Sequence, residues 1–146
     1  MTRGALNVLD NREAGVFLVI EGGAVDWANH DNDLGRMIEE QIEFDNAVRA
    51  VIDWIEMSSS WDETLVIVTS DHETGHLWGE GCHEPAVFRE LEDRGPGNMP
   101  GYTYYSRSHT NTLVPFYAKG AGSELLMKRA DEMDIIRGPY LDNTEI

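Results

Sequence analysis

Two short apolar runs, separated by a long helical repeat, decide the fold class of this chain. The runs at 15–20 and 64–69 are rich in β-branched residues and have the length of strands buried on both faces. Between them, residues 33–57 repeat apolar side chains at helical spacing with acidic side chains in the intervals, which predicts an amphipathic helix. A third run, 112–118, contains Pro115 and predicts an edge strand or a bulge. This order predicts an α/β domain with a mostly parallel central sheet and flanking helices.

The segments outside these runs are shorter or irregular. Residues 3–11 have the pattern of the end of a helix, and a short helix is expected at 123–132. The stretch 78–105 carries repeated glycine and proline, which predicts a long irregular connection. At 146 residues, of which 41% are hydrophobic, the chain is long enough for one domain with its own core.

Composition excludes several classes of function. The net charge of −16, from 27 acidic and 11 basic residues, repels nucleic acid, whose binding depends on Lys and Arg at the phosphates. No stretch approaches the ~20 apolar residues needed to span a bilayer, and no signal peptide is visible. We therefore expect neither nucleic acid nor a membrane as a partner. The single cysteine, Cys82, excludes an internal disulfide and a cysteine-based zinc cluster.

A first cluster of acids and imidazole directly follows the first apolar run. Glu21 and two glycines precede Asp26 and His30, which are four residues apart and would share one face of a helix. An Asp/His pair at this spacing, taken alone, is more often a surface ion pair. Here it follows a predicted buried strand and two glycines, which let the backbone approach a ligand closely, so a binding site is favoured.

The second cluster, Asp71-His72, follows the run at 64–69. Adjacent residues cannot share one face of a helix, so a loop just after a strand is expected, which is where α/β proteins build their sites. An Asx turn is the alternative explanation. Because parallel strands end at the same edge of a sheet, the two clusters should converge. Carboxylates and imidazoles in one crevice predict a two-metal site.

The remaining histidines are weaker signals when each is taken alone. His109 lies in a loop before the third run, where a histidine is usually only solvated. Catalytic zinc keeps three protein ligands and one open position, so His109 is the candidate third ligand beside Asp26 and His30. His76 could orient a ligand without touching the metal, and for both His76 and His83 a surface role or an indirect role of this kind is favoured over direct coordination.

These segments resemble those of the alkaline phosphatase family. One of its metal-binding segments, Val-Glu-Gly-Gly-x-Ile-Asp-Trp-x-x-His, is matched by Ile20-Glu21-Gly22-Gly23-Ala24-Val25-Asp26-Trp27-Ala28-Asn29-His30. Two further segments are matched by Val68-Thr69-Ser70-Asp71-His72-Glu73-Thr74-Gly75 and by His109-Thr110 with Val114-Pro115. The likeness runs from about residue 4 to residue 121 and includes the start of the long helix.

The resemblance implies metal-dependent hydrolysis of phosphate monoesters by a partial sandwich of that family's fold. It also implies phosphate monoesters or inorganic phosphate as ligands, allows a homodimer of the full-length enzyme, and indicates a periplasmic or secreted location. The implied metal ligands are Asp26, His30 and His109 for a first Zn²⁺, Asp71 and His72 for part of a second Zn²⁺ site, and Glu21 for Mg²⁺.

The chain also departs from the family pattern. The family's nucleophilic serine, the aspartate beside it and an arginine that clamps phosphate have no counterpart before Glu21. The last residues, 141–146, resemble the approach to a final helix. Residues 1–146 are therefore expected to form a single partial domain, the carboxyl-terminal portion of the catalytic domain, which is cut at both ends and inactive by itself. Position 76 is often glycine in the family and is His76 here.

Two alternatives stay open on the sequence. The chain could belong to another member of the same metallohydrolase superfamily, such as a phosphodiesterase or a phosphoglycerate mutase. It could instead be a non-catalytic module whose closed zinc site serves folding only. The catalytic interpretation requires an open coordination position at the ion held by Asp26, His30 and His109.

Overall fold

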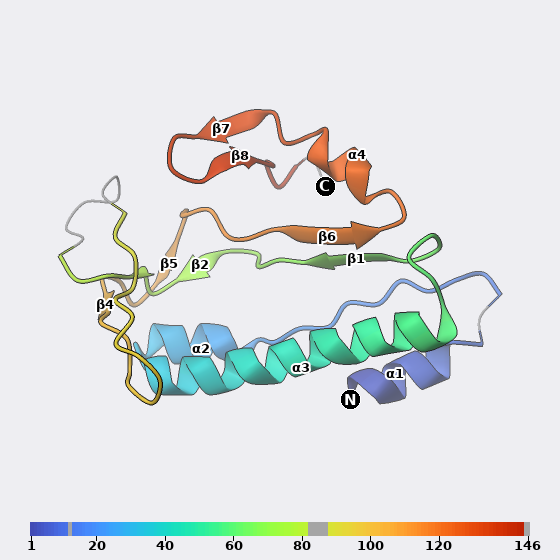
Figure 1. Ribbon diagram of the computed structural model, residues 1–146, viewed down its shortest axis with the longest axis horizontal. Helices are drawn as coiled ribbons and strands as arrows, with labels where there is room; N and C mark the ends of the chain where they lie inside the picture. The colour runs from blue at the N-terminus through green and yellow to red at the C-terminus, as the bar shows by residue number, and fades with distance from the viewer. Residues whose placement is uncertain (12, 82–87, 145–146) are drawn as a thin grey trace.

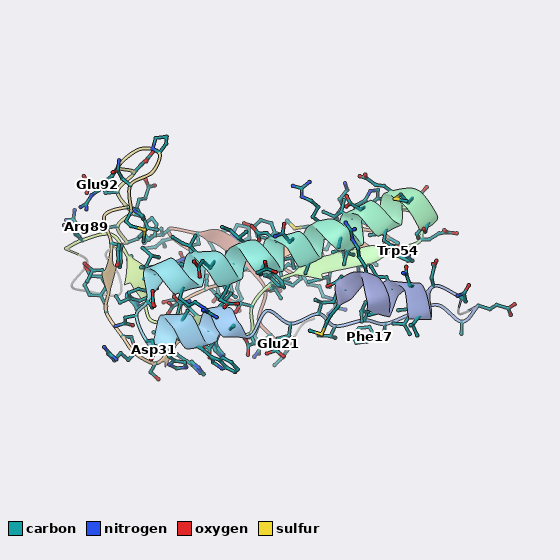
Figure 2. All side chains as sticks on the ribbon, turned by 90° about the horizontal axis from the view of Figure 1, so that it is seen from below. Phe17, Glu21, Asp31, Trp54, Arg89 and Glu92 are labelled. Carbon is teal, nitrogen blue, oxygen red and sulfur yellow. The ribbon has the colours of Figure 1, made fainter. Side chains whose placement is uncertain are left out.

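A layer of three helices lies against thin two-stranded ribbons in the computed structural model, which describes residues 1–11, 13–81 and 88–144 (Figure 1). The helices are α1 (Thr2–Leu9), α2 (Ala24–His30) and α3 (Leu34–Ser58), and both shorter helices pack on α3. Figure 2 shows the three helices side by side in one layer, with strands behind them. No helix among the described residues is long and apolar enough to cross a membrane.

The long helix α3 confirms the prediction for residues 33–57 almost to the residue. Asp33 caps its N-terminus, because the Asp33 carboxylate accepts a hydrogen bond of 3.0 Å from the backbone N–H of Arg36. Leu34 and Ile55 are buried near its two ends, at 2% and 0% exposed. Helix α1 likewise confirms the helical pattern at 3–11 and places Leu6 in the core at 5% exposed.

The principal ribbon pairs β1 (Leu65–Val68) with β6 (Tyr117–Gly120) in antiparallel register, from Leu65 opposite Gly120 to Val68 opposite Tyr117. Gly120 adopts φ +103°, and a Cβ at this position would overlap the carbonyl oxygen of Thr64. Only glycine combines this backbone conformation with so close an approach of the neighbouring chain. The strand predicted at 64–69 is thus confirmed as β1.

The α/β class is confirmed, but the expected parallel sheet is wrong. Every ribbon of the described residues is two-stranded and antiparallel. The predicted strand at 15–20 runs extended in the same direction as β1 without joining a ladder (Figure 1). Phe17 and Val19 are 93% and 74% exposed, while Leu18 and Ile20 line a cavity of about 180 Å³ with α3 and β1. An apolar run favours extended backbone, but a strand also needs a neighbouring chain at about 4.8 Å, and no described segment supplies one here.

Two very short ribbons position the loop that carries His109. Strand β2 (Glu73–Thr74) pairs with β5 (His109–Thr110), and β3 (Leu77–Trp78) pairs with β4 (Thr103–Tyr104). These pairs lie beyond the carboxyl end of β1, beside α2 (Figure 1). The stretch 78–105, predicted as irregular, therefore contains the short strand β4, which pairs with β3.

The carboxyl-terminal elements differ in extent from their predictions. The strand expected at 112–118 forms only from Tyr117 and continues to Gly120, because Pro115 has no N–H to donate to a ladder. The helix expected at 123–132 is limited to α4 (Ser123–Met127). Residues beyond it form a hairpin of β7 (Glu132–Asp134) and β8 (Gly138–Tyr140) instead.

Candidate metal centre

Helix α2 presents Asp26 and His30 on one face, as their spacing predicts. The Oδ2 atom of Asp26 lies 3.4 Å from Nε2 of His30. Both side chains are about one-third exposed, at 32% and 36%, so they open toward solvent while the helix backbone packs on α3. The first half of the predicted site thus forms within one helical turn.

Strand β5 brings His109 to the same point. Nε2 of His109 lies 3.0 Å from Nε2 of His30 and 3.5 Å from Oδ1 of Asp26. One ligand atom from each of the three side chains falls within 4.8 Å of the others. The predicted meeting of these three residues, which are separated by up to 83 positions, is present in the structure.

The hydrogen bonds of His30 show which of its nitrogens can bind an ion. Nδ1 of His30 lies 2.7 Å from the backbone carbonyl oxygen of Arg107, and a carbonyl can only accept, so Nδ1 carries the proton. Nε2 of the neutral ring then holds a lone pair facing Asp26 and His109. A carboxylate and two imidazoles around a common point match the donor set that holds zinc with one position left open.

The second predicted cluster lies next to the first. Oδ2 of Asp71 is 3.3 Å from Nε2 of His72, and the His72 ring stacks on the ring of His109 with centroids 3.6 Å apart. Glu21, Asp26, Asp71 and His72 all line one cavity of about 520 Å³. The predicted convergence therefore occurs, because residues 15–20 and β1 run in the same direction and end at the same side of α3 (Figure 1).

The two glycines after Glu21 allow close packing of side chains around the cavity. A Cβ on Gly22 would lie 2.8 Å from the ring of Phe44, and a Cβ on Gly23 would lie 2.9 Å from a carboxylate oxygen of Glu21. The contact with the Phe44 ring is closer than side-chain carbons tolerate, whereas a Cβ on Gly23 would only displace the flexible end of the Glu21 side chain. Glu21 stands immediately before α2 (Figure 2), so the glycines let its carboxylate lie against the chain at the cavity wall.

Sequence reasoning missed Thr74, which contacts both clusters. Its side chain is buried, at 6% exposed, and its hydroxyl lies 2.6 Å from Oδ1 of Asp26 and 3.2 Å from Nδ1 of His72. In the β2–β5 ribbon Thr74 is the direct partner of His109. The signal available in the sequence was its place two residues after His72, which is a weak signal because threonine there also suits an ordinary strand.

The structure gives His76 an aromatic environment. Its ring stacks on Trp78 with centroids 4.5 Å apart and meets Tyr105 edge-on at 5.9 Å. Its backbone is left-handed, with φ +47°, and its N–H donates a 2.7 Å hydrogen bond to the carboxylate of Glu73. The structure thus places His76 in an aromatic cluster. Cys82 and His83 lie outside the described residues.

Tyr104 holds α2 through a hydrogen bond to Asn29. Its hydroxyl donates a 2.7 Å hydrogen bond to Oδ1 of Asn29, which lies in α2 between Asp26 and His30. Burial raises the pKa of Tyr104 to about 12, with smaller contributions from Tyr102 and neighbouring acids. The hydroxyl therefore still donates to Asn29 in alkaline solution.

The raised pKa of Tyr104 predicts how the stability of the fold changes at alkaline pH. Tyr104 should lose its proton near pH 12, whereas an unperturbed tyrosine titrates near 10. The raised pKa contributes stability that is fully present below pH 10 and is lost as the pH rises through about 12, because the unfolded chain releases the proton first. Ultraviolet titration of tyrosinate absorbance should show a late phase from Tyr104, and Tyr104→Phe should remove that phase. A parent titration in which every tyrosine ionises near pH 10 would contradict the burial argument.

Comparison with known proteins gives the site its context. The sequence model of the alkaline phosphatase family matches residues 1–87. Alkaline phosphatase 3 of Bacillus subtilis (strain 168) is 40% identical over 75 residues, which are 51% of this chain and 16% of that protein. The membrane-bound alkaline phosphatase of Bombyx mori is 43% identical over 72 residues, which are 49% of this chain and 12% of that protein. The alkaline phosphatase of Gadus morhua is 29% identical over 131 residues, 80% of this chain and 26% of that protein.

Solved structures agree with these matches. The alkaline phosphatase of the Antarctic bacterium TAB5 superposes with a TM-score of 0.65 and 30% identity, over 84% of this chain and 33% of that chain. A mutant of that enzyme described with Mg bound in its M3 site gives a TM-score of 0.65 and 31% identity, over 84% of this chain and 34% of that chain. The chain thus spans about one third of these structures and about one sixth of the Bacillus relative. Because the family model matches more than half of the residues, the chain belongs to the alkaline phosphatase family.

Proposed function

We propose that the protein hydrolyses phosphate monoesters with bound metal ions and that this chain is the carboxyl-terminal portion of its catalytic domain. The observation that carries the proposal is the convergence of Asp26, His30 and His109, whose ligand atoms lie within 4.8 Å of one another. Membership of the alkaline phosphatase family favours this activity over the phosphodiesterase and mutase alternatives. The proposed ligands of the protein are phosphate monoesters and inorganic phosphate.

The three residues of this centre would hold a first zinc ion. The Arg107 carbonyl fixes the proton of His30 on Nδ1, so that Nε2 is free to coordinate. Pairing of β5 with β2 places His109 at this centre. The i, i+4 spacing on α2 places Asp26 beside His30. When bound, zinc would supply Lewis acidity that polarises a phosphoryl oxygen.

The other candidate ligands would supply only part of the coordination that the remaining ions need. Asp71 and His72 offer two ligands to a second zinc, and Asp71 is strongly exposed, at 85% of its side chain. Glu21 offers one carboxylate at the cavity wall to magnesium, which is usually bound through more than one carboxylate or phosphate oxygen. We therefore propose that both sites are completed in the whole protein, for which a homodimer and a periplasmic or secreted location are proposed by family resemblance.

Zinc and phosphate binding test the proposal together. Calorimetric titration of the 146-residue chain with zinc should show one tight site, and free metal is then removed by gel filtration. Inorganic phosphate should bind the zinc-loaded chain and fail to bind the metal-free chain, because a net charge of −16 repels an anion unless a metal reverses the local sign. Sodium chloride at equal ionic strength serves as the control titrant.

The outcomes separate the proposal from its rival. Zinc binding followed by phosphate binding supports an open, catalytic type of site. Zinc binding without any phosphate binding would support the closed zinc module that serves folding only. A chain that binds no zinc would overturn the proposed first metal centre.

A further inference from the structure

Thr74 lies where the two clusters of the candidate metal centre meet. It is the one buried polar side chain identified among the described residues, at 6% exposed, and it faces His109 across the β2–β5 ribbon. Its hydroxyl is within hydrogen-bond distance of Asp26, from the first cluster, and of His72, from the second. A single hydroxyl group therefore connects ligands that are proposed for two different ions.

The protons of this chain of contacts can be assigned by elimination. A threonine hydroxyl has one proton and two lone pairs, and an ionised carboxylate only accepts. The hydroxyl therefore donates to Oδ1 of Asp26, at 2.6 Å. The hydroxyl oxygen can then only accept at its contact of 3.2 Å with Nδ1 of His72, so a neutral His72 ring that makes this hydrogen bond carries its proton on Nδ1. The His72 ring then keeps its lone pair on Nε2, the atom that lies 3.3 Å from Asp71.

We propose that Thr74 is a positioning residue that sets the orientation of Asp26 and the tautomer of His72 at the same time. This inference rests on the proposed function, since it assigns Thr74 to the same metal centre. Its geometry repeats the arrangement at His30, where the Arg107 carbonyl holds the proton on Nδ1 and leaves Nε2 free. Partners of this kind fix ring orientation and ligand basicity, and their loss typically lowers metal affinity about 10- to 100-fold.

Three variants isolate the hydroxyl group. Thr74→Val keeps the shape of the side chain and removes the hydroxyl, whereas Thr74→Ser keeps the hydroxyl and removes only a methyl group. Thr64→Val is the matched control, because the Thr64 hydroxyl is also hydrogen-bonded, at 2.8 Å to Ser59, but lies at the far end of β1. Circular dichroism verifies that each variant keeps the parent's helix content.

Two measurements decide the proposal. Zinc affinity by calorimetry should fall about 10- to 100-fold in Thr74→Val and stay near the parent value in Thr74→Ser and Thr64→Val. Long-range ¹⁵N–¹H spectra of the metal-free chain should show His72 as the Nδ1–H tautomer in the parent and Thr74→Ser, and should show this preference lost in Thr74→Val. A merely structural role for Thr74 would leave the tautomer of His72 unchanged.

Other results of the same measurements would contradict the proposal. Parental zinc affinity together with a parental His72 tautomer in Thr74→Val would overturn the role of Thr74. If the parent itself binds no zinc, the proposed metal centre fails, and the tautomer spectra still decide whether Thr74 orients His72. If Thr74→Val does not fold, the Thr74→Ser variant tests the proposal instead. Loss of the Nδ1–H tautomer of His72 in Thr74→Ser would contradict the proposal, and retention of that tautomer would support it.

Discussion

The 146-residue chain alone should hydrolyse an aryl phosphate at least about 10⁴-fold more slowly than the roughly 10 s⁻¹ typical of enzymes. The hydroxyl groups that line the metal-site cavity are already engaged. Thr69 donates to the Pro115 carbonyl at 3.0 Å, and Ser70 donates to the His72 carbonyl at 2.7 Å. Carbonyl oxygens are not general bases, so neither hydroxyl is activated as a nucleophile. Thr74 is buried, at 6% exposed, and its hydroxyl donates to Oδ1 of Asp26 at 2.6 Å.

The assay uses p-nitrophenyl phosphate at alkaline pH with saturating zinc and magnesium. A mock preparation from host cells that do not express the chain controls for host phosphatase. Turnover near 10 s⁻¹ would contradict the expectation, and its loss in Ser70→Ala would identify Ser70 as the nucleophile. A small residual rate above that of water is compatible with the expectation, because binding and electrostatics alone accelerate such reactions.

Removal of either histidine of the first centre should abolish tight zinc binding. We expect His30→Ala and His109→Ala to weaken zinc by more than the roughly 10- to 100-fold that loss of an outer partner costs, because each removes a direct ligand. His72→Ala should retain the tight site, since His72 belongs to the second cluster and reaches the first only by stacking on His109. Calorimetric titration of the four proteins measures the difference.

The variants are chosen to separate the loss of a zinc ligand from a displacement of the loop before β5. His30→Ala also frees the Arg107 carbonyl and can release the loop before β5, so His109→Ala is the cleaner test of ligation. His76→Ala is the matched control, because its ring stacks on Trp78 in the aromatic cluster. Equal weakening of zinc in His72→Ala and His109→Ala would show that no independent first site exists. Loss of zinc in His76→Ala as well would indicate a general loss of fold.

Local pattern alone predicted the elements that depend on neighbours in the sequence. The apolar repeat at 33–57 predicts α3 (Leu34–Ser58), because helical hydrogen bonds and the buried stripe are both set within a few residues. The spacing of Asp26 and His30 likewise places them on one helical face, with 3.4 Å between their ligand atoms. The run at 64–69 predicts β1, and the motifs after both runs predict the residues that surround the cavity.

Tertiary structure decided what depends on a partner distant in the sequence. Residues 15–20 are as apolar as β1, yet only β1 has a neighbouring strand, β6, to complete its hydrogen bonds. His109 reaches Asp26 because β5 pairs with β2, and no periodicity in the sequence encodes that pairing. The proton positions on the histidines depend on the carbonyl of Arg107 and the hydroxyl of Thr74, which long-range folding places beside them. The sequence by itself therefore determined the candidate ligands and the helix that carries Asp26 and His30. The tertiary contacts determined that His109, expected in a loop, lies in β5, and they determined which ligands meet and which nitrogen of each ring is free to bind.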